Sequence, residues 1–198
     1  MKRFMRSGLA ALLMLGALAC EEKTDRTDTG GVQLRVTDIT GFPTTVSVNR
    51  PTTPGGTVLN CSTRTQSQCF VVVDSVTLSS IVISGQTLSD ISTVQIKSYE
   101  VTYSRRQPGT RTPPRLVRGL GSVVSPNGTV AFTNLPLLGP EQLLSVPLAD
   151  LLIENGSFDT ETRGTIVTLD LQVSFFGEFL NGRAIRSEPI GFTLSLVP

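Results

Sequence analysis

Residues 167–175, Val-Thr-Leu-Asp-Leu-Gln-Val-Ser-Phe, alternate large apolar and polar side chains without interruption. Successive side chains of a strand point to opposite faces of a sheet, so this period of two predicts a strand with one buried face. Residues 190–196, Ile-Gly-Phe-Thr-Leu-Ser-Leu, repeat the pattern. Asn181-Gly182 between the two stretches is typical of a hairpin turn. The C-terminal part of the chain therefore predicts antiparallel β-structure.

Short segments of the same kind precede this stretch and are separated by turn residues. Apolar and polar residues alternate over 32–37, and the pattern resumes at 46–48 after Gly41-Phe42-Pro43. Residues 69–73 are apolar on both faces, which predicts a central strand, and residues 76–83 predict another strand. Several short strands separated by turns, in a chain rich in β-branched residues, are typical of a sandwich or barrel.

One predicted strand, over residues 93–103, contains an irregularity. Its apolar positions change parity between Ile96 and Tyr99. A parity change inside one strand predicts a β-bulge, here near Lys97-Ser98. Further along the chain, Ser125-Pro126-Asn127-Gly128 predicts a turn between two more strands.

Residues 140–155 break the strand pattern. Pro140 can open a helix, and Pro147 should interrupt it. The residues that could line one helical face are Leu143, Leu144, Leu148, Leu151 and Leu152. We therefore expect one all-β domain over residues 32–198, an antiparallel β-sandwich of immunoglobulin- or fibronectin-like architecture, with one or two short helices near 140–155.

The composition excludes several kinds of chemistry. The chain has no histidine, which rules out Ser-His-Asp and Cys-His catalysis and imidazole metal ligands. The chain also lacks the G-x-S-x-G, Walker and G-x-G-x-x-G motifs. Asp159 and Glu161 lie in the polar segment 157–164, and Asp170 faces outward from its strand, so we expect solvated surface acids. The sequence predicts a protein that is not an enzyme and has no cofactor or metal ion.

The N-terminus is a candidate targeting segment. Lys2, Arg3 and Arg6 precede an uncharged apolar run from Gly8 to Ala19. This run is too short to span a bilayer, so it predicts a removable signal peptide over residues 1–19. Cys20 follows directly.

The sequence Ala17-Leu18-Ala19-Cys20 resembles the lipobox of bacterial lipoprotein signal peptides. The resemblance covers only residues 1–20, and Ala17 stands where Leu is commoner. It implies that the mature chain begins at Cys20, whose thiol carries a diacylglycerol, and that acyl chains such as palmitate hold the protein to a membrane. In double-membrane bacteria, Asp after the lipidated Cys often signals inner-membrane retention. Glu21 at this position implies the outer membrane of the cell envelope.

Residues 20–31 contain the anchor and a charged stretch without large apolar residues, for which we expect a flexible tether. The eleven residues after Cys20 reach at most about 36–40 Å when extended. Removal of the signal peptide takes away three of the 17 basic residues, which leaves a net charge of about −2 against 16 acids. This balance predicts no binding to nucleic acid.

Cys61 and Cys69 remain as an even pair outside the cytoplasm. Because that environment is oxidising and their spacing suits a loop, the pair predicts a structural disulfide. Free thiols, or a redox or metal pair, are the alternatives. The seven residues between them, 62–68, include no apolar side chain.

Residues 104–118, SRRQPGTRTPPRLVR, carry five arginines and no acid. Guanidinium groups match carboxylate and phosphate geometry, so this stretch could bind anions such as acidic glycans, lipid head groups or an acidic protein face. In the other interpretation, the stretch is a solvated loop whose arginines pair with Glu100 and other surface acids. The candidate anion-binding residues are Arg105, Arg106, Arg111, Arg115 and Arg118.

Together these features predict a non-catalytic envelope lipoprotein that acts as a structural or interaction module at the membrane surface. Its expected partners are the membrane, through the N-terminal lipid, and another envelope protein or an anionic glycan. The alternative is a module that binds anionic glycan or lipid head groups through residues 105–118.

Overall fold

The structure is a computed structural model that describes residues 31–49, 70–83, 92–106 and 108–198. The candidate lipidation residue Cys20, the signal peptide, most of the tether, and the Cys61–Cys69 pair lie outside these ranges. The strands are β1 (Val32–Thr40), β2 (Thr45–Ser47), β3 (Val71–Val82), β4 (Val94–Arg105), β5 (Leu116–Val124), β6 (Thr129–Leu138), β7 (Val167–Phe179), β8 (Ala184–Arg186) and β9 (Ile190–Val197).

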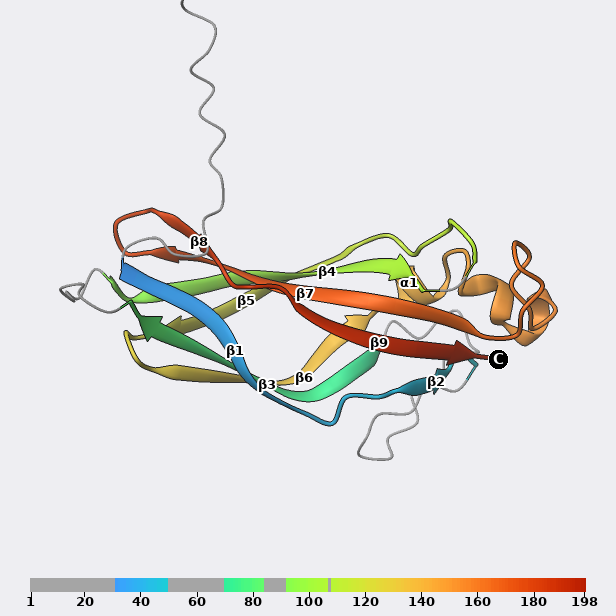
Figure 1. The fold of residues 1–198 in the computed structure, drawn as a ribbon, viewed down its shortest axis with the longest axis horizontal. Helices are drawn as coiled ribbons and strands as arrows, with labels where there is room; N and C mark the ends of the chain where they lie inside the picture. The colour runs from blue at the N-terminus through green and yellow to red at the C-terminus, as the bar shows by residue number, and fades with distance from the viewer. Residues whose placement is uncertain (1–30, 50–69, 84–91, 107) are drawn as a thin grey trace, which may run out of the picture.

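The strands form two sheets that pack face to face (Figure 1). One sheet has the order β1-β3-β6, and the other has the order β2-β9-β7-β4-β5, with β8 paired to β7. All of these pairs are antiparallel except β2 with β9, which is parallel. The expected all-β sandwich is confirmed.

The predicted turns lie where the chain changes sheet or reverses. After β1 the chain crosses to the second sheet at Gly41-Phe42-Pro43, where Gly41 has φ +68° and Phe42 stacks on Phe192 with centroids 4.4 Å apart. The turn at residues 125–128 carries the chain from β5 in one sheet to β6 in the other. Asn181-Gly182 joins the antiparallel pair β7 and β8, as predicted.

The predicted bulge is confirmed. The register of β4 shifts between Ile96 and Ser98 against both of its neighbours, β5 and β7. The shift keeps apolar residues on the buried face on both sides of it, because Ile96 and Tyr99 are both buried.

The prediction of two strands over 69–83 was wrong. A single strand, β3, runs through the polar Asp74-Ser75 step, and it is the central strand of its sheet. The ladder to β6 crosses the polar step, with Val73 opposite Leu135 and Ser75 opposite Thr133, whereas the ladder to β1 ends at Ser75 opposite Thr40. Backbone pairing therefore outweighs the local interruption of the apolar pattern.

Short helical turns form the connection between β6 and β7, as expected. They are α1 (Pro140–Leu143), η3 (Ala149–Leu151) and η4 (Ile153–Asn155). Four of the five leucines that could share one face are buried, but Leu144 is 47% exposed. Pro147 lies between α1 and η3, which agrees with its predicted role as a break.

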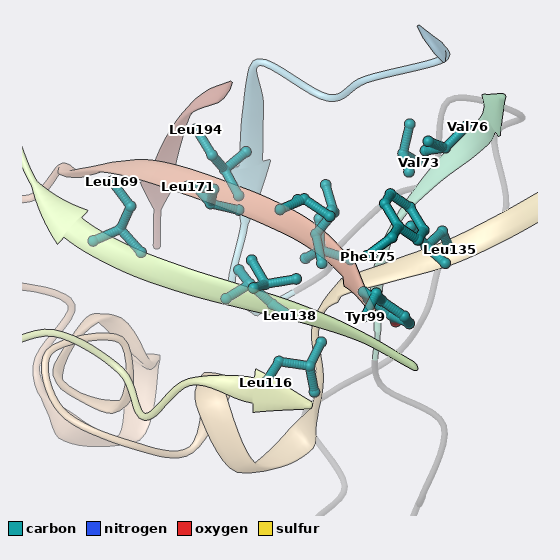
Figure 2. Close-up of a cluster of buried hydrophobic side chains, with 14 of the residues drawn as sticks. Val73, Val76, Tyr99, Leu116, Leu135, Leu138, Leu169, Leu171, Phe175 and Leu194 are labelled. Atoms are coloured by element: carbon teal, nitrogen blue, oxygen red, sulfur yellow. The ribbon is translucent and has the colours of Figure 1, made fainter. Parts of the chain in front are cut away.

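The core lies between the sheets and is mostly aliphatic, with Tyr99 and Phe175 as its largest fully buried side chains (Figure 2). Phe175 of β7 is fully buried, 6.0 Å from Tyr99 and 5.6 Å from Phe132 between ring centroids. The Tyr99 hydroxyl donates to the carbonyl of Pro136 at 2.8 Å, and Tyr103 donates to Leu137 at 2.7 Å. Burial raises the pKa of both phenols, so they remain protonated donors that tie β4 to β6.

The two ends of the sandwich differ. At the entry end, the N–H of Ile83 donates to the carbonyl of Gly31 at 2.8 Å, and the N–H of Ser80 donates to Gly128 at 3.0 Å. At the opposite end, which we call the loop end, β4 ends, β5 and β7 begin, and the helical connection lies (Figure 1). The arginine-rich stretch 105–118 lies at the loop end.

Candidate functional site

The guanidinium group of Arg105 is enclosed at the loop end. Arg105 is the last residue of β4, and only 1% of its side chain is exposed. Its Nη2 donates to Asp159 Oδ2 at 2.8 Å, and its Nη1 donates to Glu161 Oε2 at 3.3 Å. The side chain of Asp159 is fully buried, while that of Glu161 is 23% exposed. Arg105 is therefore already paired with two carboxylates inside the protein.

Glu161 also fastens the arginine-rich stretch to the segment 157–164, which we call the acidic loop. Its Oε1 accepts hydrogen bonds from the backbone N–H of Thr110 at 2.8 Å and from the Thr110 hydroxyl at 2.9 Å. Its Oε2 accepts a bond from the backbone N–H of Arg111 at 3.2 Å. One carboxylate thus joins two loops that lie about fifty residues apart in the chain.

Gly109 is required for this closure. Its φ is +124°, and a Cβ there would lie 2.6 Å from Arg105 Nη1 and 3.0 Å from Glu161 Oε2. Any other residue would be strained and would also push against the buried guanidinium. The Pro108-Gly109 step lets the chain turn tightly over Arg105.

The acidic loop is held in shape by its own side chains. Asp159 accepts bonds from the Thr162 hydroxyl and from the backbone N–H of Glu161, in addition to Arg105. The hydroxyl and the N–H of Thr160 both donate to Asp150 of η3. The side chain of Asp159 therefore organises the loop as well as neutralising Arg105.

The pKa values of the carboxyl groups follow from these contacts. Burial by itself would raise the pKa of Asp159, but hydrogen bonds from Arg105, Thr162 and Glu161 outweigh it and hold the pKa below its ordinary value. Backbone N–H donors of Thr110 and Arg111 lower the pKa of Glu161. The carboxyl groups therefore stay ionised at neutral pH. A general acid would need the opposite shift.

These shifts predict acid sensitivity. The ordinary pKa values are 3.8 for Asp159 and 4.5 for Glu161, and the pKa values in the folded protein are lower. The two ionised carboxylates therefore stabilise the fold at pH values above the ordinary pKa values. This stabilisation is lost as the pH falls through the lower pKa values of the folded protein. Urea unfolding should give a lower free energy of unfolding at pH 3 than at pH 7. Asp159→Asn should flatten this dependence. If Asp159→Asn lost as much free energy of unfolding between pH 7 and pH 3 as the parent chain does, the role given to Asp159 would be contradicted.

The other four arginines have separate partners. The guanidinium of Arg106 lies 3.1 Å from Asp170, and that of Arg115 lies 3.0 Å from Glu100. Nη1 of Arg111 donates to the Thr160 hydroxyl at 3.3 Å. The guanidinium carbon of Arg118 lies 4.7 Å from the centroid of the Phe70 ring.

The arginines are thus distributed over several partners rather than gathered around a shared anion site. Pairing of one of these arginines with Glu100 agrees with the interpretation that they pair with surface acids, and the partner is Arg115. Asp170 lies at the outer face of β7, as predicted, where the Thr193 hydroxyl and Arg106 lower its pKa. The expectation that Asp159 is a solvated surface acid was wrong, because the fold carries Arg105 onto it and closes both loops over the pair.

An open cleft of about 670 Å³ lies between the two loops. It is lined by Pro108, Gly109, Thr110, Glu161, Thr162, Gly164, Thr165 and Ile166. The carboxylate of Glu161 is already occupied by its four donors, and the Thr162 hydroxyl by Asp159. A molecule in this cleft would therefore contact chiefly backbone atoms, threonine side chains and the half-exposed Ile166.

The described residues form neither a metal site nor a membrane-spanning helix. No three His, Cys, Asp or Glu side chains there are arranged to hold a metal ion. Within the described ranges, every helix falls short of the length and apolarity that crossing a bilayer requires. Comparison of the chain with family models, with curated proteins and with solved structures finds no match.

Proposed function

We propose that the protein is a non-catalytic envelope lipoprotein whose β-sandwich serves as an interaction module at the membrane surface. The proposal is supported chiefly by the position of Gly31 and the first strand, β1, relative to the loop end. The described chain enters the sandwich at Gly31, at the end opposite the loops around Arg105 and the acidic loop. A chain held by a lipid on Cys20 would present the loop end away from the membrane.

The strand order supports an immunoglobulin- or fibronectin-like module. When β1, β3, β4, β5, β6, β7 and β9 are lettered A, B, C, C′, E, F and G, the two sheets read A-B-E and G-F-C-C′. This is the order of an immunoglobulin-type sandwich without strand D. Tyr99 is a buried aromatic residue on the strand lettered C, the strand on which antibody domains carry a buried tryptophan. Such sandwiches commonly act as interaction modules at cell surfaces.

The state of the carboxylates supports a non-catalytic role. Asp159 and Glu161 are paired with Arg105, and their pKa values are lowered. A glycosidase needs two facing carboxyl groups, one of them with a raised pKa. The same groups fit a structural ion-pair network that holds the loops in place.

The lipid anchor is tested by Cys20→Ser. The variant should move from the membrane fraction to the soluble fraction and should no longer incorporate labelled palmitate. Two signals or chains are needed for stable anchoring, so loss of the acylation site should abolish membrane binding rather than weaken it. Cys61→Ser is the matched control and should remain in the membrane fraction. A Cys20→Ser chain that stays with the membrane would remove the anchoring proposal.

The exposed arginines favour a second candidate function, binding of anionic glycan or lipid head groups at the loop end. The side chains of Arg106 and Arg115 are 62% and 72% exposed. Exposed ion pairs contribute little free energy, so these guanidinium groups can exchange a protein carboxylate for a ligand anion. Arg105 does not serve this function, because it is buried.

Charge reversal separates this second candidate from the first. Arg106→Glu with Arg115→Glu should abolish retention on heparin-type or anionic-vesicle surfaces, and rising ionic strength should do the same to the parent chain. Arg183→Glu, at the entry end, is the matched control. Retention that is insensitive to salt and to the double variant would eliminate the arginine-based site.

A further inference from the structure

Strand β5 forms an open edge of the larger sheet. It is the terminal strand in the order β2-β9-β7-β4-β5, and its residues from Leu116 to Val124 pair with β4 on one side. No strand among the described residues pairs with its other side. An edge strand of this kind presents unpaired N–H and C=O groups that can accept another strand.

The other edges carry prolines, charges or short lengths that block such pairing. Strand β5 has none of these apart from one arginine, although its ladder to β4 shifts register between Gly119 and Ser122. Strand β6 contains Pro136 and has Asn134 at φ +52°, and β1 carries the charged residues Arg35 and Asp38. Strand β2 has only three residues. In contrast, β5 is nine residues long and contains no proline. Its single charged residue, Arg118, lies over a phenylalanine ring.

The outward-facing row of β5 is small and apolar. Val117 and Val123 are 55% and 59% exposed, and Gly119 and Gly121 lie between them. A Cβ at Gly121 would meet nothing within 4 Å, and one at Gly119 would meet only the carbonyl of Lys97, at 4.0 Å. The outer face of the strand is therefore open beside its unpaired edge, and a second strand on that edge would meet small apolar side chains.

The sequence of the strand is nearly self-complementary. Residues 116–124 read LVRGLGSVV, which is close to a palindrome centred on Leu120. In an antiparallel pair of two copies with Leu120 opposite its own equivalent, Val117 faces the partner's Val123, and Gly119 faces the partner's Gly121. Arg118 faces the partner's Ser122 rather than a second arginine, so the register places no like charges opposite each other.

We propose that two copies of this chain associate through β5, paired antiparallel about a two-fold axis at Leu120, so that their larger sheets become continuous. Such an interface is isologous and closed, which limits the assembly to a dimer. Because the copies run antiparallel, their Gly31 ends lie at opposite ends of the pair, and the loop end of each copy lies beside the entry end of the other. The pair therefore differs from a single anchored chain, whose loop end would lie away from the membrane. This inference goes beyond the proposed anchoring and does not depend on lipidation.

The register provides the test. Opposed residues of an antiparallel pair have Cα atoms about 4.5–5.5 Å apart, within disulfide range. The full chain carrying both Val117→Cys and Val123→Cys should therefore form a disulfide-linked dimer on mild oxidation. In each single variant, the new cysteine lies six residues out of register with its copy, about 20 Å away by the strand rise, and should not cross-link.

The parent chain, which has Cys61 and Cys69, gives the background dimer on the same non-reducing gel. A dimer band that rises above background only in the double variant is the expected result. Equal cross-linking of the double and single variants, or none in any of them, would overturn the proposed register and with it the proposed pairing.

A second measurement does not depend on new cysteines. Light scattering on the detergent-solubilised full chain should give twice the chain mass, and Val123→Lys should return it to one chain mass, because a charge at an edge prevents strand pairing. Leu180→Lys is the matched control, since Leu180 is 65% exposed but lies outside β5. A monomer in the parent chain, with or without another protein bound to it, or an undiminished dimer in Val123→Lys, would refute the inference.

Discussion

Asp159→Ala is expected to destabilise the domain by about 3–5 kcal/mol, the cost of removing one partner from a buried ion pair. The variant leaves the guanidinium of Arg105 charged and 1% exposed, with Glu161 as its remaining carboxylate. It also removes the acceptor for the Thr162 hydroxyl and for the N–H of Glu161. The loss of these bonds should loosen the acidic loop as well as weaken the domain.

Chemical denaturation at pH 7 measures this effect. Arg115→Ala is the control, because it breaks an ion pair at the same end of the sandwich in which the arginine is 72% exposed. Exposed pairs contribute about 0–1 kcal/mol, so the control should differ little from the parent chain. Similar losses in Asp159→Ala and Arg115→Ala would show that the buried pair does not hold the loop end together.

Phe175→Ala should cost about 3–5 kcal/mol, as large-to-small substitutions of buried aromatics do. Phe175 is fully buried between the sheets and contacts both Tyr99 and Phe132 (Figure 2). Its removal leaves a cavity where β7 of one sheet meets β6 of the other. Surrounding side chains can fill only part of that space.

The neighbouring residue supplies a control with the same side chain. Phe176 faces the other side of β7, where Arg186 lies 5.4 Å from the centroid of its ring. Phe176→Ala should lose that cation–π contact and cost about 1 kcal/mol. Thermal or urea unfolding of the two variants distinguishes the faces of the strand. Equal destabilisation would contradict the assignment of Phe175 to the core.

Much of the strand pattern could be predicted from local sequence, because burial on one face leaves a period of two. The bulge near Lys97-Ser98 is the clearest case. Changing parity is the only way for Ile96 and Tyr99 to face the same core within one strand, so the apolar positions record the backbone irregularity directly. The switch of sheets after Gly41 and the hairpin at Asn181-Gly182 were similarly marked by turn residues.

The polar step inside β3 shows where local pattern is insufficient. Asp74-Ser75 looks like a break, but the strand continues because β6 pairs with β3 on both sides of the step, at Val73 and at Ser75. The choice of pairing partners is also non-local. Neither the strand order nor the division into a three-stranded and a larger sheet can be predicted from the sequence of any single segment.

The candidate site illustrates the same limit for charged residues. Glu100 was predicted as one partner of the arginines, but the sequence did not show which arginine would pair with it. Asp159 lies 54 residues from Arg105 in the chain, and its burial depends on the path of both loops. The sequence left open whether the five arginines bind anions or pair with surface acids, and it named only Glu100 among those acids.

The proposed role depends first on how the mature chain begins. Mass spectrometry of the N-terminal peptide from the envelope-purified protein tests this directly. The N-terminal peptide should start at Cys20 and carry the added mass of a diacylglyceryl group. A mature chain that starts elsewhere, or one in which Cys20 carries no lipid, would contradict it.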